Sequence, residues 1–374
     1  MNTIVLGANH NNALGLVRSL GESNNKVYVL LYKDFINYVA LSKYVTKCYY
    51  IDRQHSKVEQ IINICKTLES KPLLFSTSDE DATYINDNAS LLAPYCFFEG
   101  GIDINKYRNK DASNIIAKQC GLCIPKTHVL QSCEQTISDI AIPAIIKANN
   151  SIKGGKSLLH RIDNLEQLYT SLKNIPSDCY PVQVQEYIKK EYELMLLGCS
   201  LSEGTIVFCP VAQRKYRFYP NEYNAGSFSC SINPTSDQKL ISLQEKVSQY
   251  MKRIKYTGLF SAEFVYKDGV YYFCEINLRN DGTSYIATKS GYNLPNILCN
   301  FYNNGNTNLI GTFSSSHYMV NISDFGNVLK KRISIWTWIK DFGLANCYSH
   351  YNKRDIIPYI GFLLSFIIKK ILKK

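Results

Sequence analysis

Short apolar runs separated by amphipathic stretches dominate the first hundred residues. Residues 2–31 contain an apolar run, a turn rich in glycine and asparagine, a helical pattern and a second apolar run. This order is typical of a strand–helix–strand unit that opens a parallel α/β domain. Residues 71–87 add a strand and a helix that begins near Ser78 or Asp79, because both residue types cap helices well. We therefore predict an N-terminal α/β domain over 1–104.

A second pattern begins after this domain, with shorter strands and two helical stretches. Residues 110–119 have helical spacing and end at glycine and proline breakers, and residues 238–254 carry apolar side chains at helical spacing. Strand-like segments lie at 142–150, 180–188, 191–200, 205–218 and 259–278, the last of them a hairpin. We predict a second domain over 105–310, a small subdomain within it at about 122–188, and a C-terminal extension over 311–374.

The composition is that of a globular protein, with 45% hydrophobic and 20% charged residues among 374. The N-terminus has no basic flank followed by a long apolar run, so no signal peptide is predicted. The thirteen cysteines have no regular spacing, which favours reduced thiols in the cytoplasm over a disulfide framework. A zinc site has no support in this pattern.

Positive charge is concentrated near the C-terminus. The net charge is +11, and residues 326–374 hold ten Lys or Arg and two Asp, whereas the preceding residues hold 32 Lys or Arg and 29 Asp or Glu. The main body of the chain therefore gives no indication of nucleic-acid binding.

The last residues combine an uncharged stretch with a basic end. Residues 356–368 carry no charge, fall short of the roughly 20 residues that a membrane-spanning helix needs, and are followed by four lysines within six residues. Such a segment forms either a C-terminal core helix or an amphipathic helix at an anionic membrane surface. We predict a cytoplasmic protein and keep both alternatives open, the second being peripheral contact of 356–374 with the inner face of the cell membrane.

The stretch CEINLRNDGTS carries three polar residues at alternate positions. Glu275, Asn277 and Arg279 share one face if this stretch is a β-strand. A three-residue hairpin loop with Gly269 in the left-handed conformation would bring Glu263 onto the same face, whereas a two-residue loop would not. Two carboxylates and an amide are suitable oxygen ligands for Mg²⁺, and an arginine can contact phosphate. The alternative is an exposed strand face with solvated acids.

Three further features favour a phosphate site. Lys147 ends an apolar strand, where a buried cation is costly unless it meets an anion. The glycine pair at 154–155 could bring backbone N–H groups close to phosphate oxygens, although an ordinary hairpin turn is the alternative. The strand edge at 185–188 offers backbone groups that could bind an adenine.

In this order, four segments of the chain resemble the ATP-grasp superfamily over roughly residues 1–300: NKDASNIIAKQCGLCIPKT, IPAIIKANNSIKGGKS, VQEYIKKEYEL and GLFSAEFVYKDGVYYFCEINLR. The resemblance implies a Rossmann-like α/β pre-ATP-grasp domain, a small lid subdomain and a C-terminal α+β subdomain, with ATP between the last two. It also implies an enzyme that joins a small-molecule carboxylate to an amine through an acyl phosphate, with ATP and Mg²⁺ or Mn²⁺ as cofactors.

The resemblance assigns the nucleotide to two lysines, a loop and a hinge. Lys110 and Lys147 match the lysines that hold the ATP phosphates, and Glu193 matches the residue that holds the ribose. The loop that covers the phosphates matches Lys153, Gly154, Gly155, Lys156 and Ser157, and the adenine hinge matches Gln185, Glu186, Tyr187 and Ile188.

The resemblance also assigns a metal site. Glu263, Glu275 and Asn277 match the Mg²⁺ ligands, and Arg279 matches the arginine of an E-x-N-x-R element. The metal face worked out from strand alternation and the resemblance thus lead to the same residues. A substrate used in assembling the cell envelope or surface polysaccharide would suit a location at the membrane, and this expectation rests on the tail alone.

The chain departs from the family at one catalytic position. Some ligases of the family carry an arginine two residues before the first metal ligand, and here that residue is Ser261. We expect the anion to be stabilised instead by Arg279, Arg214 or Arg217. Lys215 is interpreted as a solvated residue of a basic strand.

Three other functions stay open. An ATP-dependent phosphotransferase would need no amine, and a non-catalytic nucleotide-binding interaction protein would need no intact metal face. A dinucleotide-dependent oxidoreductase rests only on the first strand–helix–strand unit, which lacks the G-x-G-x-x-G fingerprint.

Overall fold

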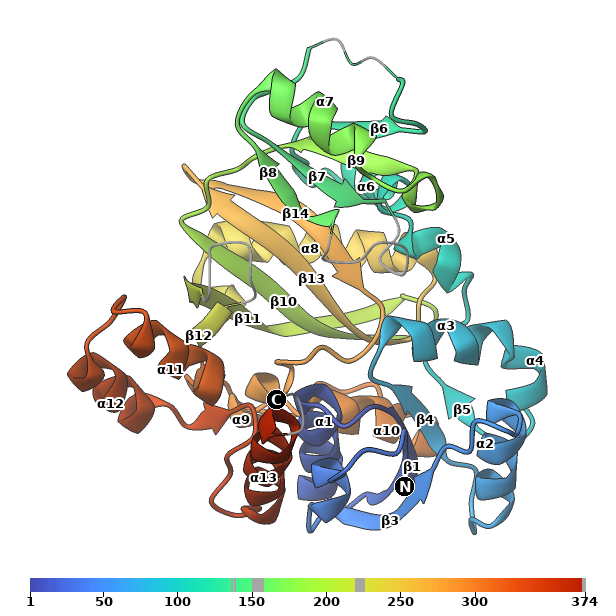
Figure 1. Ribbon diagram of the computed structural model, residues 1–374. Coiled ribbons are helices and arrows are strands. Elements are labelled where there is room, and N and C mark those ends of the chain that lie inside the picture. The colour runs from blue at the N-terminus through green and yellow to red at the C-terminus, as the bar shows by residue number, and fades with distance from the viewer. Residues whose placement is uncertain (136, 138, 150–157, 219–225, 372–374) are drawn as a thin grey trace.

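The computed structural model describes residues 1–374 apart from 136, 138, 150–157, 219–225 and 372–374. The described residues form three β-sheets (Figure 1). A four-stranded sheet lies at the top of Figure 1, a seven-stranded sheet in the middle and a five-stranded sheet at the bottom. One parallel and two largely antiparallel sheets confirm the predicted combination of α/β and α+β architecture.

The N-terminal sheet is parallel, in the order β3-β2-β1-β4-β5. The predicted strand–helix–strand opening is confirmed, because β1 and β2 pair in parallel with α1 between them. Ser78 caps α3 by accepting the backbone N–H of Asp81 at 3.1 Å. The elements are β1 (Asn2–Gly7), α1 (Asn11–Glu22), β2 (Lys26–Leu31), η1 (Tyr38–Leu41), β3 (Val45–Tyr50), α2 (Lys57–Lys66), β4 (Leu73–Ser76), α3 (Asp79–Asp87), α4 (Ala89–Leu92) and β5 (Phe97–Phe98).

The four-stranded sheet has the order β6-β9-β7-β8 and a hydrophobic core of its own, which includes Ile146, Leu168 and Val184. Two helices precede it, and the second matches the predicted helix over 110–119. The elements are α5 (Ile104–Arg108), α6 (Lys110–Gln119), β6 (Thr127–Leu130), β7 (Ala144–Ala148), β8 (His160–Ile162), α7 (Leu165–Lys173), η3 (Ser177–Cys179) and β9 (Val182–Glu186).

The seven-stranded sheet has the order β14-β13-β10-β11-β12-β15-β16. Helix α8 covers one face, where Leu194, Leu196 and Phe264 pack with Val247 and Met251 of the helix. Strands β10 and β11 pair antiparallel, and the predicted helix over 238–254 is confirmed. The elements are β10 (Tyr192–Leu201), β11 (Ile206–Phe218), β12 (Gly226–Ile232), η4 (Pro234–Ser236), α8 (Gln238–Ile254), β13 (Gly258–Lys267), β14 (Val270–Asn277), α9 (Tyr285–Lys289), α10 (Leu294–Asn304), β15 (His317–Met319) and β16 (Cys347–Tyr348).

The hairpin β13–β14 differs from its prediction. Lys267 pairs with Val270, so the loop has two residues, and both Asp268 and Gly269 have positive φ angles of 49° and 82°. This is the conformation that favours Asp-Gly in tight hairpins, so the predicted three-residue loop is wrong. The register then shifts by one residue at a β-bulge between Glu263 and Phe264 of β13.

Because of this bulge, Glu263 and Glu275 still lie on one face of the sheet, as the predicted three-residue loop would have placed them. Phe264 pairs with Phe273, but Glu263 pairs with Glu275, so that Cys274 is the extra residue. Glu275 therefore points to the same side of the sheet as Glu263, opposite to α8.

One hydrophobic core joins the five-stranded sheet to the seven-stranded sheet. Val5 of β1 is buried in the same cluster as Leu197 of β10 and Leu298 of α10. The buried amide of Asn12 donates at 2.8 Å to the backbone carbonyl oxygen of Asn280, just beyond β14. The end of the hairpin is thus tied to the N-terminal domain. The predicted domain boundaries near 104 and 310 stay predictions.

The C-terminal segment packs on the outside of the N-terminal sheet through a buried ion pair. Arg18 Nε lies 3.0 Å from Asp355 Oδ2, and both side chains are buried. The following helix lies on the surface against η1, with most of its large side chains exposed, so the core-helix alternative is wrong. Among the described residues, no helix has the length and apolar character needed to cross a membrane. The helices are α11 (Asn321–Leu329), α12 (Ile335–Leu344) and α13 (Ile357–Ile371).

The Arg18–Asp355 pair is expected to be a major anchor of the C-terminal segment. Removal of one partner leaves the other charge buried without compensation, which typically costs about 3–5 kcal/mol. Asp355→Ala should therefore lower the free energy of unfolding by about 3 kcal/mol, measured by urea denaturation with circular dichroism. Glu69→Ala is the control, because it breaks an exposed pair with Lys26 and should change this free energy by less than about 1 kcal/mol. Equal effects of the two substitutions would contradict the anchor.

Candidate active site

Three oxygen-bearing side chains meet on the face of the seven-stranded sheet opposite α8. Glu263 lies directly across the hairpin from Glu275, and Ser261 lies across from Asn277. The amide nitrogen of Asn277 donates to Glu263 Oε1 at 3.1 Å and to Ser261 Oγ at 3.3 Å. The structure thus brings together the three side chains that the sequence predicts as metal ligands.

The donor set fits a hard cation that keeps part of its water shell. Within the described part of the chain, no group of three or more His, Cys, Asp or Glu side chains could hold a metal ion. Glu263, Glu275 and Asn277 instead supply two carboxylates and one amide. Mg²⁺ is commonly held by one or two carboxylates together with water and substrate phosphates, so these residues fit that ion.

The two carboxylates are incompletely neutralised by the protein. Burial raises the pKa of Glu263 to about 7, and the nearby charge of Glu275 raises it further than Lys215 lowers it. Two partly buried acids held side by side favour binding of a cation, because a cation would stabilise both charged forms.

Two lysines approach the same acids from the four-stranded sheet and from α6. Lys110 Nζ lies 3.3 Å from Glu275 Oε2, and Lys147 Nζ donates to Gln185 Oε1 at 3.0 Å. Burial lowers the pKa of Lys147 to about 8, and the charge of Lys110 lowers it too. An anion between the lysines would relieve this unfavourable burial of positive charge. The site therefore offers an anion position beside the cation position.

Strand β11 turns Lys215 toward this face, contrary to its interpretation as a solvated residue. Lys215 is 6% exposed and pairs in register with Glu193 of β10. Burial lowers the pKa of Lys215, but Glu263 and Asp281 raise it by more, so the net shift is upward. Lys215 is thus a buried, charged lysine beside the predicted metal ligands.

The neighbouring arginines lie elsewhere. Arg214 is exposed, pairs with Leu194 on the α8 side, and has its guanidinium carbon 4.1 Å from the centroid of the Tyr192 ring. Arg217 forms ion pairs with Asp324, at 2.9 Å, and with Asp341. Neither geometry supports the predicted anion-stabilising role. Strand alternation turns Arg214 away from the face that Lys215 occupies, and Arg217 is engaged by Asp324 and Asp341.

Arg279 links the metal-ligand face to the N-terminal domain. Its Nε donates to Asp79 Oδ1 at 2.7 Å, and its Nη2 donates to Asn277 Oδ1 at 3.3 Å. Burial lowers the pKa of Arg279, but Asp79 raises it by more, so the guanidinium stays charged. Asp79, which the sequence indicates mainly as a residue of a helix start, is therefore a structural partner of the site.

Asp281 is a site residue that sequence reasoning missed. It lies two residues beyond Arg279, and Thr283 Oγ1 donates to its Oδ1 at 2.8 Å. Burial raises its pKa, but Lys215 and Arg279 lower it by more, so it is charged. The alternation of Glu275, Asn277 and Arg279 continues to this residue, and this was the signal available in the sequence.

The predicted adenine hinge has two of its backbone donors already engaged. The N–H of Glu186 donates to the Lys126 carbonyl at 2.8 Å, and that of Tyr187 donates to the Pro143 carbonyl at 2.9 Å. Ile188 follows them directly, after the end of β9. If this segment binds an adenine as predicted, the backbone groups left for it are the carbonyl groups and the Ile188 N–H.

The structure describes the predicted ribose residue but not the predicted phosphate loop. Glu193 accepts from Lys190 Nζ at 2.5 Å, at the end of β10 nearest this hinge. Lys153, Gly154, Gly155, Lys156 and Ser157 lie outside the described residues.

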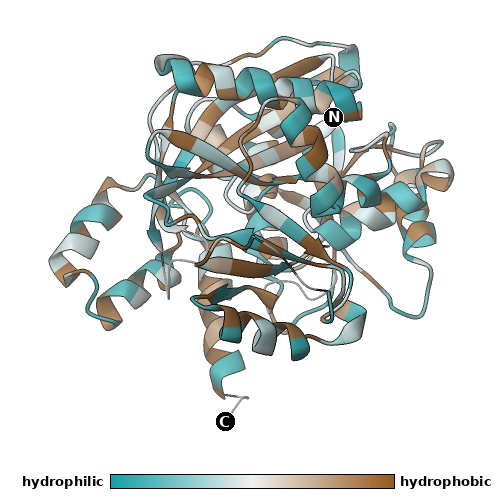
Figure 2. Ribbon diagram, turned by 90° about the horizontal axis from the view of Figure 1, so that it is seen from above, coloured by the Kyte–Doolittle hydropathy of each residue, from teal (hydrophilic) through white to brown (hydrophobic). Residues whose placement is uncertain are grey.

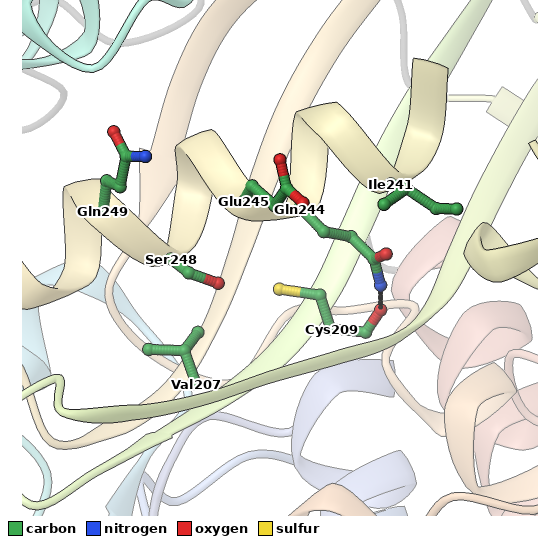
Figure 3. Close-up of a pocket in the computed structure, with 7 residues that line it drawn as sticks. All are labelled: Val207, Cys209, Ile241, Gln244, Glu245, Ser248 and Gln249. Carbon is green, nitrogen blue, oxygen red and sulfur yellow. Dashed lines mark hydrogen bonds between the residues drawn. The ribbon is translucent and has the colours of Figure 1, made fainter. Parts of the chain in front are cut away.

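A larger cavity than the one at the metal-ligand face is on the other side of the sheet. It has a volume of about 440 Å³ and lies between α8 and β11, where Gln244 Nε2 donates to the Cys209 carbonyl at 2.6 Å (Figure 3). A much smaller cavity, of about 20 Å³, touches the metal-ligand face between Asp79, Lys110 and Asn277. Convergence of charged groups, and not cavity size, therefore identifies the candidate site.

The fold and the candidate site define a class of protein in which acidic and basic side chains converge between a small antiparallel sheet and a larger one. Residues 116–291 match the family model of the ATP-grasp domain. The sequence motifs predict the same ATP-grasp domain over this part of the chain.

Relatives and solved structures agree with this assignment. The chain is 27% identical over 158 residues to the formate-dependent phosphoribosylglycinamide formyltransferase of Prochlorococcus marinus subsp. pastoris, which is 41% of this chain and 38% of the relative. It thus spans well under half the length of that relative. The structure of N5-carboxyaminoimidazole synthetase from Staphylococcus aureus complexed with ADP has a TM-score of 0.65 at 13% identity, covering 88% of this chain and 86% of the other. L-amino acid ligase from Bacillus licheniformis has a TM-score of 0.58 at 14% identity, covering 80% and 74%.

The raised pKa of Glu263 predicts a pH-dependent cost to stability. Its folded-state pKa of about 7 exceeds its ordinary value of 4.5, so the free energy of unfolding should fall as pH rises from about 4.5 to about 7. Glu263→Gln removes this cost and should raise the free energy of unfolding at about pH 8 by roughly 1 to 3 kcal/mol. Thermal and urea denaturation across this pH range would measure it.

A matched control and a metal titration sharpen this measurement. Glu203→Gln changes an exposed acid in a turn and should leave the pH profile unaltered. Mg²⁺ should raise the midpoint temperature of the wild type and not that of Glu263→Gln. A wild-type pH profile identical to that of Glu263→Gln would contradict the burial of this charge.

Proposed function

We propose that this protein is an ATP- and Mg²⁺-dependent ligase that joins a carboxylate to an amine through an acyl phosphate. The observation that carries the proposal is the approach of Lys110 and Lys147 to the face that holds Glu263, Glu275 and Asn277. A cation site and an anion site side by side suit a metal-bound polyphosphate better than either group alone. A relative named as a formate-dependent formyltransferase and a structural neighbour named as an L-amino acid ligase support the same reaction class.

The residues divide the work of phosphoryl transfer. Glu263, Glu275 and Asn277 would hold Mg²⁺, which would neutralise charge on the phosphates. Lys110 and Lys147 would bind the phosphate oxygens and orient the terminal phosphorus for in-line attack by a carboxylate oxygen of the substrate, with ADP leaving. The amine then attacks the acyl carbon, loses a proton, and inorganic phosphate leaves. The protein acts by positioning and by neutralising charge.

Lys215 is our proposal for the missing anion-stabilising cation. Ser261 stands where some family members have an arginine, and its hydroxyl accepts from Asn277 in the ligand set. Lys215 lies on the same face and is surrounded by Glu193, Glu263 and Asp281. A buried ammonium in that position can stabilise negative charge that develops on the phosphoryl group or the acyl oxygen. Arg279, held by Asp79, would support the ligand set from the other end.

Membrane association and an envelope or surface-polysaccharide substrate remain proposals that rest on the C-terminal segment. They are independent of the chemistry above, because that segment contributes none of the metal or phosphate ligands proposed here.

The reaction class is tested by product analysis. Purified protein with Mg²⁺ and ATP is incubated with pooled carboxylic acids and pooled amines, and ADP is identified by mass. We expect ADP only when one acid and one amine are both present. ADP with an acid alone would favour a phosphotransferase, and ATP binding without ADP would favour the non-catalytic alternative. Glu275→Ala should abolish turnover with circular dichroism unchanged, whereas Glu245→Ala, on the far side of the sheet, should remain active.

Adjacent substitutions on β11 test the proposal for Lys215. Lys215→Met should lower kcat about 100-fold or more, because removal of one charge-stabilising donor has an effect of this size. Arg214→Met is the matched control, since its side chain lies on the opposite face, and kcat should change less than about threefold. ATP binding should persist in both variants, measured by calorimetry. Equal loss of kcat in the two variants would contradict the assignment.

A further inference from the structure

Helix α13 packs its smallest residues against the protein. Its buried residues are Pro358, Gly361 and Ser365, which lie three and four positions apart on one side of the helix. A Cβ atom added to Gly361 would lie 2.7 Å from Leu41 Cδ1, so glycine permits the close approach of α13 to η1. The helix is therefore firmly seated, but it buries few of its apolar atoms.

Phe362 packs against the core, but most other large apolar residues of α13 are exposed. We define the outer row as five exposed side chains that recur every three or four positions, each 49–65% exposed: Ile357, Ile360, Leu364, Ile367 and Ile371. Leu363 and Phe366 widen the apolar surface on one side of this row, and Ile368 widens it on the other. A helix with small residues inside and bulky apolar residues outside is suited to an apolar environment on its outer side.

Helix α12 also exposes large apolar side chains. None of its residues is buried, and Trp336 is 77% exposed, next to exposed Ile335 and Ile339. Figures 1 and 2 show the α11–α12 pair projecting from the edge of the molecule, with α13 following it in the chain.

Aromatic contacts join the two helices. Trp338 and Phe342 of α12 stack with ring centroids 5.2 Å apart, and Phe342 lies 5.1 Å from Tyr348. Tyr351 then lies 5.2 Å from Tyr348 and 5.6 Å from Tyr359 of α13. Tyrosine and tryptophan are enriched where protein meets the boundary between lipid and water.

The exposed charge of this segment is positive. From residue 321 onward the described chain has three acids, and all three are engaged in ion pairs with the body of the protein: Asp324 and Asp341 with Arg217, and Asp355 with Arg18. Exposed lysines flank both helices, at Lys330, Lys331, Lys340, Lys353 and Lys370. The surroundings of the apolar residues are thus complementary to a negatively charged surface.

We propose that α12 and the outer row of α13 dock onto an anionic lipid bilayer, with the helices lying in the interface. A coiled coil with a second copy of the chain is the competing occupant, because the outer row has the 3,4 spacing of a coiled-coil seam. The row spans only about two heptads, however, its apolar surface is wider than such a seam, and a second copy would bring like charges together. A bilayer with negatively charged headgroups would accommodate both the wide apolar surface and the positive charge around it.

Vesicle binding tests the proposal. Full-length protein is mixed with vesicles of phosphatidylcholine alone or of equimolar phosphatidylcholine and phosphatidylglycerol, and the bound fraction is measured by flotation. We expect binding to the anionic vesicles that weakens with added salt. Leu364→Glu should lower this binding at least about tenfold, because burial of one leucine contributes that much. Leu91→Glu, at a similarly exposed leucine of α4, should bind like the wild type.

Fluorescence separates membrane docking from loose adsorption. Both tryptophans of the chain lie in α12, so Trp338→Phe leaves Trp336 as the sole reporter. Its emission should shift to shorter wavelength with anionic vesicles and not with phosphatidylcholine. No vesicle binding by the wild type, or equal binding by Leu364→Glu, would overturn the proposal. A dimer in analytical ultracentrifugation that Leu364→Glu dissociates, without vesicle binding, would assign the outer row to a second copy instead.

Discussion

The candidate site depends on one β-bulge. Side chains of a strand alternate between faces, so a shift of one residue moves every later side chain to the other side of the sheet. Cys274 supplies that shift between Phe273, which packs toward α8, and Glu275, which faces Glu263. If Cys274 instead paired regularly with Glu263, without a bulge, Glu275 and Asn277 would point into the apolar layer under α8, where neither could bind an ion. The tight Asp-Gly loop and the bulge therefore act together: the loop sets the register and the bulge corrects it.

Two ionisable side chains that this register brings to the site have shifted pKa values. Burial raises the pKa of Glu263 to about 7 and lowers that of Lys147 to about 8. Burial therefore disfavours the charged form of both side chains. A cation alone would stabilise the charged carboxylates but destabilise the charged lysines. An anion alone would have the opposite effects. A metal–polyphosphate complex carries both signs at a short separation and relieves both groups. The electrostatics thus argue for a bound ion pair, independently of any sequence motif.

Local signals predict much of this molecule, because many elements follow from short-range physics. The helix over 238–254, the strand–helix–strand opening and the alternation of Glu275, Asn277 and Arg279 all depend on neighbours in the sequence. Which side chains of β11 face the site does not depend on sequence neighbours alone. Lys215 faces the site and Arg214 faces away because of how β11 pairs with β10, and nothing within "QRKYRF" distinguishes the two. The role of Asp79 as the partner of Arg279 likewise requires contact between residues 200 positions apart.

The C-terminal helix illustrates a different limit of sequence reasoning. Its composition alone is equally suited to a buried helix and to an interfacial one, since both are apolar. The two differ in which residues face the protein, and this depends on η1, which comes so close to Gly361 that a Cβ atom there would lie 2.7 Å from Leu41 Cδ1. The Arg18–Asp355 pair then fixes the start of the helix on the surface of the N-terminal domain. A helix seated by its small residues and anchored by a buried charge can present a large apolar face without losing its place in the fold.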